Sequence, residues 1–416
     1  MTKKIVITGV GAFSPLGPNA AATWEALLRG ESGARDLPED ICKYDVEIPV
    51  NFAATVKEPA SDHLERVAAK RLDPSSQYAL LAGREAFANA GLEVGSVAPE
   101  RLMVDWATGI GGVWTLLDAW DTLRDRGARR VLPLTVPMLM PNGPAAAIGM
   151  DLEARGGIRS AVSACASSTE SIINAYDHLQ AGLADVIIAG GSEAAVHPLP
   201  IAAFASMQAL SRKNDDPATA SRPYDVNRDG FVLGEGAAAL VLETEEHALA
   251  RGATIIAEVA GGGVTSDAYH ITAPDPNGAG AIRAMEAALQ QAGATPDEVV
   301  HINAHATSTP VGDIAEATAF ANFFGERARE IPVSATKAST GHLLGGAGAI
   351  EAMFTALALQ QNLLPPTINV DEMDPEINLD VVLEPRKVDI PVGGLAISTS
   401  FGFGGHNAVV ALRKYA

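Results

Sequence analysis

The chain has 416 residues and a formal net charge of −20, with 50 acidic against 30 basic side chains. This excess of negative charge argues against a nucleic acid bound by phosphate neutralisation. The length allows two or three domains or one large duplicated unit. The only cysteines, Cys42 and Cys165, are far apart in sequence, which indicates neither a disulfide framework nor a zinc site and fits a reducing cytosol.

The first thirty residues predict a buried strand at 4–10 and a helix within 19–33. Two lysines and an apolar run superficially resemble an export signal. Gly9 and Gly11 interrupt that run, however, and its β-branched residues favour a strand. The segment also differs from a dinucleotide-binding turn, because it lacks the third glycine at the right spacing and the acidic residue that such a turn requires. No apolar stretch approaches the roughly 20 residues that span a bilayer.

Residues 34–152 are expected to contain an irregular segment followed by helices and one strand. Residues 34–73 are expected to be irregular, and a helix is expected from about Ser75 to Gly91. Residues 102–127 read as a strand, a Gly-rich turn that contains Ile110, and a helix. Residues 133–152 are rich in Pro, Met and Ala, which suits either a surface for a flexible chain or ordinary core packing.

Cys165 is predicted to lie between a short buried strand at 158–164 and a helix that Ser167 or Ser168 caps. Unpaired backbone N–H groups and the positive end of the helix dipole favour a thiolate at such a place. A lone cysteine in a small-residue turn is more often a buried apolar side chain. Distant histidines are therefore needed to support a nucleophile.

The remaining chain alternates strands and helices, which indicates the α/β class. Strands are expected at 184–196 and 237–242, and a second series is expected from 254 to 413. His305 and His342 each lie where an apolar run gives way to small and hydroxyl residues. One cysteine with two such histidines suggests a nucleophile with two imidazole partners.

The motifs at 4–17, 221–243 and 397–412, together with the cysteine and histidine segments, span nearly the whole chain. In these motifs the chain resembles the β-ketoacyl-[acyl-carrier-protein] synthases, specifically the elongating condensing enzymes of type II fatty acid synthesis. The resemblance is greatest to the actinobacterial members. The resemblance implies a thiolase-like fold with a duplicated five-layered αβαβα architecture. It also implies a cytoplasmic homodimer, with residues 1–250 carrying the cysteine and residues 251–416 carrying the histidines.

The implied reaction is the decarboxylative condensation of malonyl-carrier with an acyl group held on Cys165. By resemblance, His305 and His342 stabilise the enolate, and the N–H groups of Cys165 and Phe403 form an oxyanion hole. Lys337 supports the site electrostatically. No cofactor is bound for catalysis, since the phosphopantetheine arm arrives on the acyl carrier protein.

The resemblance also assigns supporting residues. Thr307 and Thr309 would bind the phosphopantetheine arm, with capping of the next turn as the alternative, and Phe401 would bind the substrate or that arm. Ile110 would form a wall of the acyl pocket, with ordinary strand-end packing as the alternative. Glu351 and Asp313 would support the site. A structural cation is a weaker expectation, because Thr399 replaces the usual asparagine; its ligands would be Asn303, Glu351, Ser398 and Asn407.

An acidic carrier protein requires local basic patches. The candidates are 65–73, with Arg66, Lys70 and Arg71, and 124–130, with its four arginines, and either cluster also suits a plain solvated helix face. Gln208 stands where many relatives have an arginine, although Arg212 and Lys213 follow it.

Two other functions stay open. The first is a ketosynthase of a type II polyketide pathway, which shares the same Cys/His/His set, and the second is a non-catalytic scaffold that binds the carrier protein. A thiolase is disfavoured because its second catalytic cysteine is missing. The sequence does not set the preferred acyl chain length.

Overall fold

The computed structural model describes residues 3–39, 41 and 46–416, so Cys42 lies outside the described residues. Within them the hydrogen bonds of one sheet run in the order β12-β10-β9-β14-β15-β8-β1-β7-β6-β4-β5. The strands are β1 (Ile5–Phe13), β4 (Leu102–Ala107), β5 (Gly157–Ala161), β6 (Val186–Glu193), β7 (Gly236–Thr244), β8 (Ala257–Ser266), β9 (Val299–Asn303), β10 (Pro332–Ser334), β12 (Asp380–Val381), β14 (Leu395–Gly402) and β15 (His406–Arg413). Two small sheets pair β2 (Ala34–Asp36) with β3 (Phe52–Ala54) and β11 (Leu363–Leu364) with β13 (Arg386–Lys387).

The large sheet contains the same five-strand arrangement twice. In the first half β5 and β4 run parallel to β6, and β7 then pairs antiparallel with β6 and with β1. In the second half β10 and β9 run parallel to β14, and β15 pairs antiparallel with β14 and with β8. The two halves are joined by the pairing of β1 with β8, which extends over three residues of β1. This repetition confirms the predicted duplicated α/β fold.

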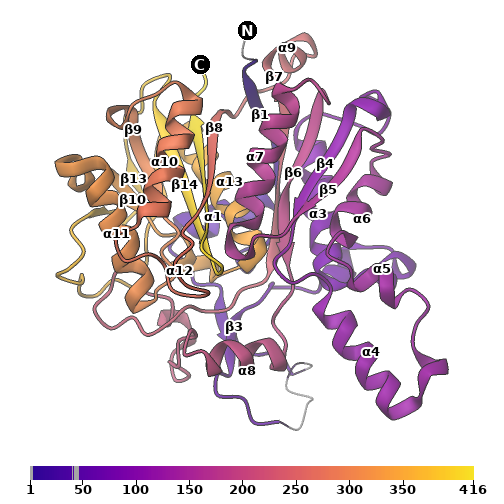
Figure 1. Cartoon of the computed structure of the whole chain (residues 1–416). Coiled ribbons are helices and arrows are strands. Elements are labelled where there is room, and N and C mark those ends of the chain that lie inside the picture. Colours follow the sequence, from indigo (N-terminus) through magenta and orange to yellow (C-terminus); the bar gives the residue numbers. More distant parts are fainter. Residues whose placement is uncertain (1–2, 40, 42–45) are drawn as a thin grey trace.

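Helices cover both outer faces and fill the space between the two halves (Figure 1). α7 (Ser167–Gln180) and α13 (Ala347–Gln361) pack together in the centre, between the strands of the two halves. α3 (Pro74–Asn89) and α6 (Gly143–Asp151) cover the first half, whereas α10 (Ala279–Ala292) and α11 (Pro310–Phe324) cover the second. The resulting five layers enclose one central and two outer apolar cores.

The other helices are α1 (Ala20–Leu28), α2 (Arg66–Ala69), α4 (Val113–Arg126), α5 (Thr135–Leu139), α8 (Pro198–Ser206), α9 (Glu245–Ala250) and α12 (Lys337–Thr340). α4 and α5 project away from the layers (Figure 1). Asn19 caps α1 by accepting from the Ala22 N–H. No helix within the described part of the chain is long and apolar enough to cross a membrane.

The outer helices approach glycines in the same way in both halves. A Cβ on Gly11 would lie 2.2 Å from the Ala82 carbonyl oxygen of α3, and one on Gly263 would lie 2.1 Å from the Ala284 carbonyl oxygen of α10. The N-terminal glycines therefore lie inside β1 and allow close packing, and they do not form a dinucleotide-binding turn.

Two expectations on this architecture are wrong. Segment 34–73 is not uniformly irregular, because it holds β2, β3 and α2. In the single chain β5 is not buried, because it is the edge strand of the large sheet: Ile158 within it and Val162 just after it are 41% and 54% exposed. Its apolar residues predicted the strand, but they did not reveal that one edge lacks a neighbour.

Candidate active site

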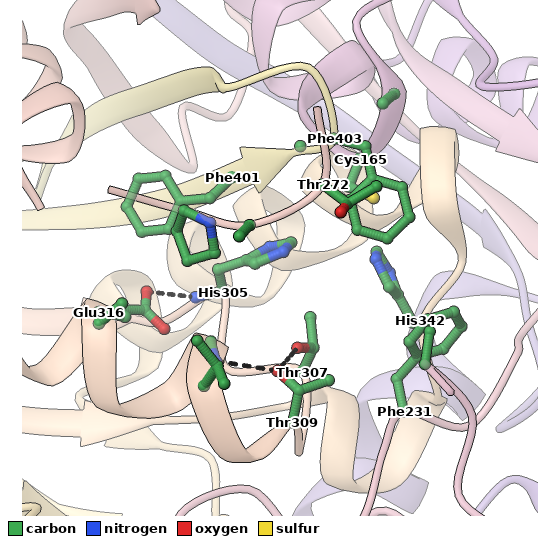
Figure 2. A pocket seen from close by; sticks show the side chains of 18 of the residues that line it. Cys165, Phe231, Thr272, His305, Thr307, Thr309, Glu316, His342, Phe401 and Phe403 are labelled. Carbon is green, nitrogen blue, oxygen red and sulfur yellow. Dashed lines mark hydrogen bonds between the residues drawn. The ribbon is translucent and has the colours of Figure 1, made fainter. Parts of the chain in front are cut away.

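A cavity of about 540 Å³ is lined by residues of both halves. Nine of the residues that the sequence singles out line it: Ile110, Cys165, His305, Thr307, Thr309, His342, Phe401, Phe403 and Asn407. Figure 2 shows the imidazoles of His305 and His342 extending toward a common space near Cys165. The remaining predicted residues, Lys337, Glu351, Asp313, Asn303 and Ser398, are buried and do not line the cavity.

Cys165 lies in a single 3₁₀ turn, Ala164–Ala166, directly before α7. The prediction that Ser167 or Ser168 caps this helix is wrong, because both residues lie inside its first turn. The Ser167 hydroxyl accepts from the Ser163 N–H at 2.8 Å, and the Ser168 hydroxyl accepts from the N–H of Ala349 in α13 at 2.9 Å. The two serines therefore hold the cysteine turn in place.

Burial raises the pKa of the Cys165 thiol to about 11. The Lys337 charge and the N–H groups of Phe403 and of Cys165 itself lower this pKa, but they do not offset the loss of solvation. The prediction of a thiolate at rest is therefore wrong. The thiol has to lose its proton as it attacks a substrate, so it needs a nearby base.

The turn between β14 and β15 carries Phe403 to the sulfur. The Phe403 N–H lies close enough to the Cys165 sulfur to lower the pKa of the thiol, as does the N–H of Cys165 itself. A Cβ on Gly402 would lie 2.8 Å from the Ser163 carbonyl oxygen and 3.1 Å from the Cys165 nitrogen, so this approach requires a glycine. Two backbone donors thus lie beside the nucleophile, as the oxyanion hole expected from the sequence requires.

The His305 and His342 rings lie with their centroids 5.4 Å apart and nearly perpendicular. Burial lowers the pKa of both imidazoles well below the ordinary value, and the Lys337 charge lowers it further. The Nδ1 of His342 accepts from the Leu344 N–H at 3.3 Å, so its proton is on Nε2. Both rings are neutral, and His342 presents an N–H donor.

Lys337 and Glu351 form an ion pair in the interior, where neither is more than 1% exposed. Burial raises the pKa of Glu351 to about 7, and the Lys337 ammonium opposes that rise. The ammonium also acts on Cys165 and on both imidazoles through space. It lies close enough to bias their protonation without lining the cavity.

The four expected cation ligands do not form one set. Asn303 and Ser398 are register partners, and the Asn303 amide donates to the Glu351 carbonyl oxygen at 3.4 Å. The Asn407 amide instead donates to Asp267 at 2.7 Å, three residues further along the strand pair. The described residues include no group of three or more His, Cys, Asp and Glu side chains that could hold a metal.

Thr309 and Asp313 have a visible structural role. Thr309 caps α11 by accepting from the Gly312 N–H at 3.2 Å, and its hydroxyl lies 3.0 Å from that of Thr307. The capping role that the sequence left open for Thr309 is thus present, although both hydroxyls also line the cavity. Asp313 accepts from the backbone N–H groups of Tyr224 and Thr309, so it holds this loop from behind.

Two buried carboxylates near the site, Glu316 and Glu193, were not predicted from the sequence. Glu316 accepts from the backbone N–H groups of His305 at 2.8 Å and Ala306 at 2.7 Å, and from the Thr399 hydroxyl at 2.8 Å (Figure 2 shows Glu316 with His305). Both glutamates interrupt runs of small and apolar residues. An acidic residue in such a run was the signal that could have identified them.

Comparisons with known proteins agree with this geometry. The model of the β-ketoacyl synthase N-terminal domain matches residues 2–248, and that of the C-terminal domain matches residues 256–371. The chain is 46% identical over 416 residues to 3-oxoacyl-[acyl-carrier-protein] synthase 2 of Staphylococcus aureus (strain COL), with 99% of each chain covered. It is 43% identical over 413 residues to the synthase of the same name from Mycobacterium bovis, with 99% of this chain and 97% of that one covered.

Solved structures give the same result. A β-ketoacyl synthase from Burkholderia phymatum STM815 has a TM-score of 0.91 and 35% identity, with both chains covered completely. A type II polyketide ketosynthase in complex with its acyl carrier protein also has a TM-score of 0.91, at 29% identity and with the same coverage. By sequence, fold and site geometry, this chain belongs to the β-ketoacyl synthase family.

Proposed function

We propose that this chain is a 3-oxoacyl-[acyl-carrier-protein] synthase that elongates fatty acids by condensing malonyl-carrier with acyl-carrier. The observation that carries the proposal is the convergence of the Cys165 thiol, the paired imidazoles and the Phe403 N–H on one cavity. The relatives at 43–46% identity support fatty acid elongation over the polyketide alternative, because the type II polyketide ketosynthase described above is only 29% identical to this chain.

The first half-reaction transfers an acyl group to Cys165. The thiol sulfur attacks the thioester carbonyl of acyl-carrier while the neutral His305 imidazole accepts the thiol proton, since the Nδ1 of His342 is occupied by the Leu344 N–H and its Nε2 carries a proton. The N–H groups of Cys165 and Phe403 donate to the tetrahedral oxyanion. The carrier thiolate then leaves and takes up the proton, which returns the imidazole to its neutral state.

The second half-reaction places the thioester carbonyl of malonyl-carrier between His305 and His342. As CO₂ leaves, the electrons of the broken C–C bond form an enolate, and imidazole N–H donors stabilise its oxygen. The enolate carbon attacks the acyl-cysteine carbonyl, the Cys165 sulfur leaves as a thiolate that takes up a proton from solvent, and 3-oxoacyl-carrier forms. Neutral imidazoles suit this step because they donate a hydrogen bond without transferring a full charge.

The proposed partner is the acyl carrier protein, whose phosphopantetheine arm would pass Thr307 and Thr309. Arg66, Lys70 and Arg71, on and just after α2, are exposed and provide one docking surface. Arg126, Arg129 and Arg130 provide a second, whereas Arg124 already pairs with Asp121 and Asp125. Local positive charge of this kind attracts an acidic carrier despite the net charge of −20.

We also propose that two copies of the chain pair through the β5 edge. An edge strand with exposed apolar side chains favours pairing with another strand. The projecting α4 adds exposed Leu116, Trp120 and Leu123 on the same half of the molecule. Sedimentation equilibrium is expected to give twice the 43.0 kDa chain mass, and a monomer at micromolar concentration would contradict the pairing.

The division into halves at 250/251 and a cytoplasmic site of action complete the proposal. Residue 250 ends α9, and β8, which follows, pairs along most of its length with β15 of the second half.

Intact-protein mass spectrometry tests the function directly. After incubation with acyl-carriers of increasing chain length, the wild type is expected to gain one acyl mass and to lose it when malonyl-carrier is added, with release of 3-oxoacyl-carrier. Cys165→Ala is expected to gain no acyl mass. Stable binding of the carrier without any acylation of the wild type would support the scaffold alternative instead.

A further inference from the structure

Glu193 is a completely buried carboxylate at the end of β6, and the reaction described above does not use it. It accepts four hydrogen bonds from two separate segments. The first segment provides the N–H groups of Gly109 at 2.7 Å and Ile110 at 3.2 Å and the Thr108 hydroxyl at 3.1 Å. The second provides the N–H of Gly345 at 3.0 Å. One carboxylate thus connects two loops that are more than 230 residues apart in sequence.

The first segment forms the wall of the cavity at Ile110. Thr108 closes this turn, because its hydroxyl accepts from the Gly111 N–H at 3.0 Å while it donates to Glu193. Three of the four donors to Glu193 therefore lie in this turn. An acyl chain that shifts the backbone at Ile110 therefore stretches or breaks hydrogen bonds to Glu193.

The second segment fixes the His342 imidazole. Leu344 donates its N–H to the His342 Nδ1 from a backbone conformation with φ of +45°, which is unusual for leucine. The next residue, Gly345, donates to Glu193. The two segments also touch, since a Cβ on Gly345 would lie 2.1 Å from the Gly109 nitrogen. A shift of one segment is therefore transmitted to the other.

We infer that Glu193 is a positioning residue that couples the acyl-pocket wall at Ile110 to the orientation of His342. An acyl chain long enough to displace Ile110 moves the Glu193 carboxylate, which accepts from the Gly345 N–H. Because Leu344 directly precedes Gly345, the hydrogen bond from the Leu344 N–H that orients the His342 imidazole then changes as well. Decarboxylation of malonyl-carrier then responds to the acyl chain on Cys165. The consequence for decarboxylation rests on the proposed function, whereas the structural coupling can be tested without any catalytic activity.

The test uses hydrogen exchange after alkylation of Cys165. Iodoacetamide or N-dodecyl iodoacetamide forms a C–S bond to the Cys165 sulfur and releases iodide and a proton. Adducts that peptide mass spectrometry locates on Cys165 and not on Cys42 differ only in chain length. In the wild type, the long adduct is expected to raise amide exchange in both 108–112 and 343–346 relative to the short one. A rise confined to 108–112 would overturn the inference, and this arm requires no variant to fold.

Glu193→Gln provides the second arm, because an amide retains the shape but places an NH₂ group against backbone donors. In this variant the chain-length response is expected to remain in 108–112 and to be lost from 343–346. Glu85→Gln is the matched control, since Glu85 also accepts backbone N–H groups, from Ala12 and Ala20, but lies away from the cavity. Its joint response is expected to equal that of the wild type. A joint response in Glu193→Gln would overturn the inference.

The dependence of kcat on acyl chain length is a further measurement, which a purely structural role of Glu193 would leave unchanged. In Glu193→Gln, kcat for decarboxylation by the long-chain acyl enzyme is expected to fall about tenfold, within the usual range of coupling between sites, with KM for malonyl-carrier unchanged. A proportional loss for all chain lengths would contradict coupling. A wild type that alkylates normally but never condenses would contradict only the proposed function.

Discussion

Replacing His342 with alanine is expected to lower the rate of decarboxylation of malonyl-carrier by about a hundredfold to a thousandfold, the usual effect of removing one oxyanion donor. The Nε2–H of His342 is available because Leu344 occupies Nδ1. Acylation of Cys165 is expected to decrease much less, since the Phe403 and Cys165 N–H groups remain. The measurement is CO₂ release per acylated protein, with the acyl mass followed separately.

His63→Ala is the matched control for this experiment, because His63 is a partly exposed histidine outside the cavity. It is expected to leave both half-reactions within twofold of the wild type. Unchanged CO₂ release in His342→Ala would contradict the assigned role. An equal loss of acylation and decarboxylation would indicate instead that the variant has lost the shape of the site.

The low pKa of the buried imidazoles has a consequence for stability. In the unfolded chain a histidine gains a proton as the pH falls through about 6.5, whereas folded His305 and His342 stay neutral. The unfolded state then binds more protons, so the free energy of unfolding falls as the pH falls. His342→Ala is expected to make that fall shallower, as measured by urea unfolding at about pH 7 and pH 5.

Much of this site could be predicted because it depends on local sequence. Cys165 follows β5, His305 follows β9 and His342 lies beyond β10. The parallel pairing of β9 with β10 brings the two histidine-bearing ends to the same side of the second half. The turn at Gly402 was predictable too, because few other residues allow a backbone so close to another.

The errors came from quantities that depend on the folded environment. The helix N-terminus at Cys165 predicted a thiolate, but the pKa depends on how much water the fold removes, and this is set by residues distant in sequence. Likewise, Ser167 has a capping residue's chemistry, yet the helix begins at Ser167 itself and its hydroxyl holds the preceding turn. Glu193 was overlooked because its partners come from two distant loops.

The buried Lys337–Glu351 pair leads to the largest expected effect on stability. Lys337→Met removes the ammonium but leaves a carboxylate that is completely buried. Breaking a buried pair in this way is expected to lower the free energy of unfolding by about 3–5 kcal/mol. Because the pKa of Glu351 is about 7 with the ammonium present, Glu351 in the variant takes up a proton near neutral pH, which places the loss toward the lower end.

Urea unfolding of Lys337→Met and of the double variant with Glu351→Gln separates charge from packing. The double variant is expected to recover part of the loss, because it removes the unpaired charge as well. Lys57→Met is the matched control, since Lys57 pairs with Glu31 at the surface, where such a pair contributes about 1 kcal/mol or less. A loss in Lys337→Met as small as that in Lys57→Met would contradict a buried ion pair. The variant also removes the nearby charge that helps keep His305 and His342 neutral, so their pKa should rise toward the ordinary value even where the fold survives.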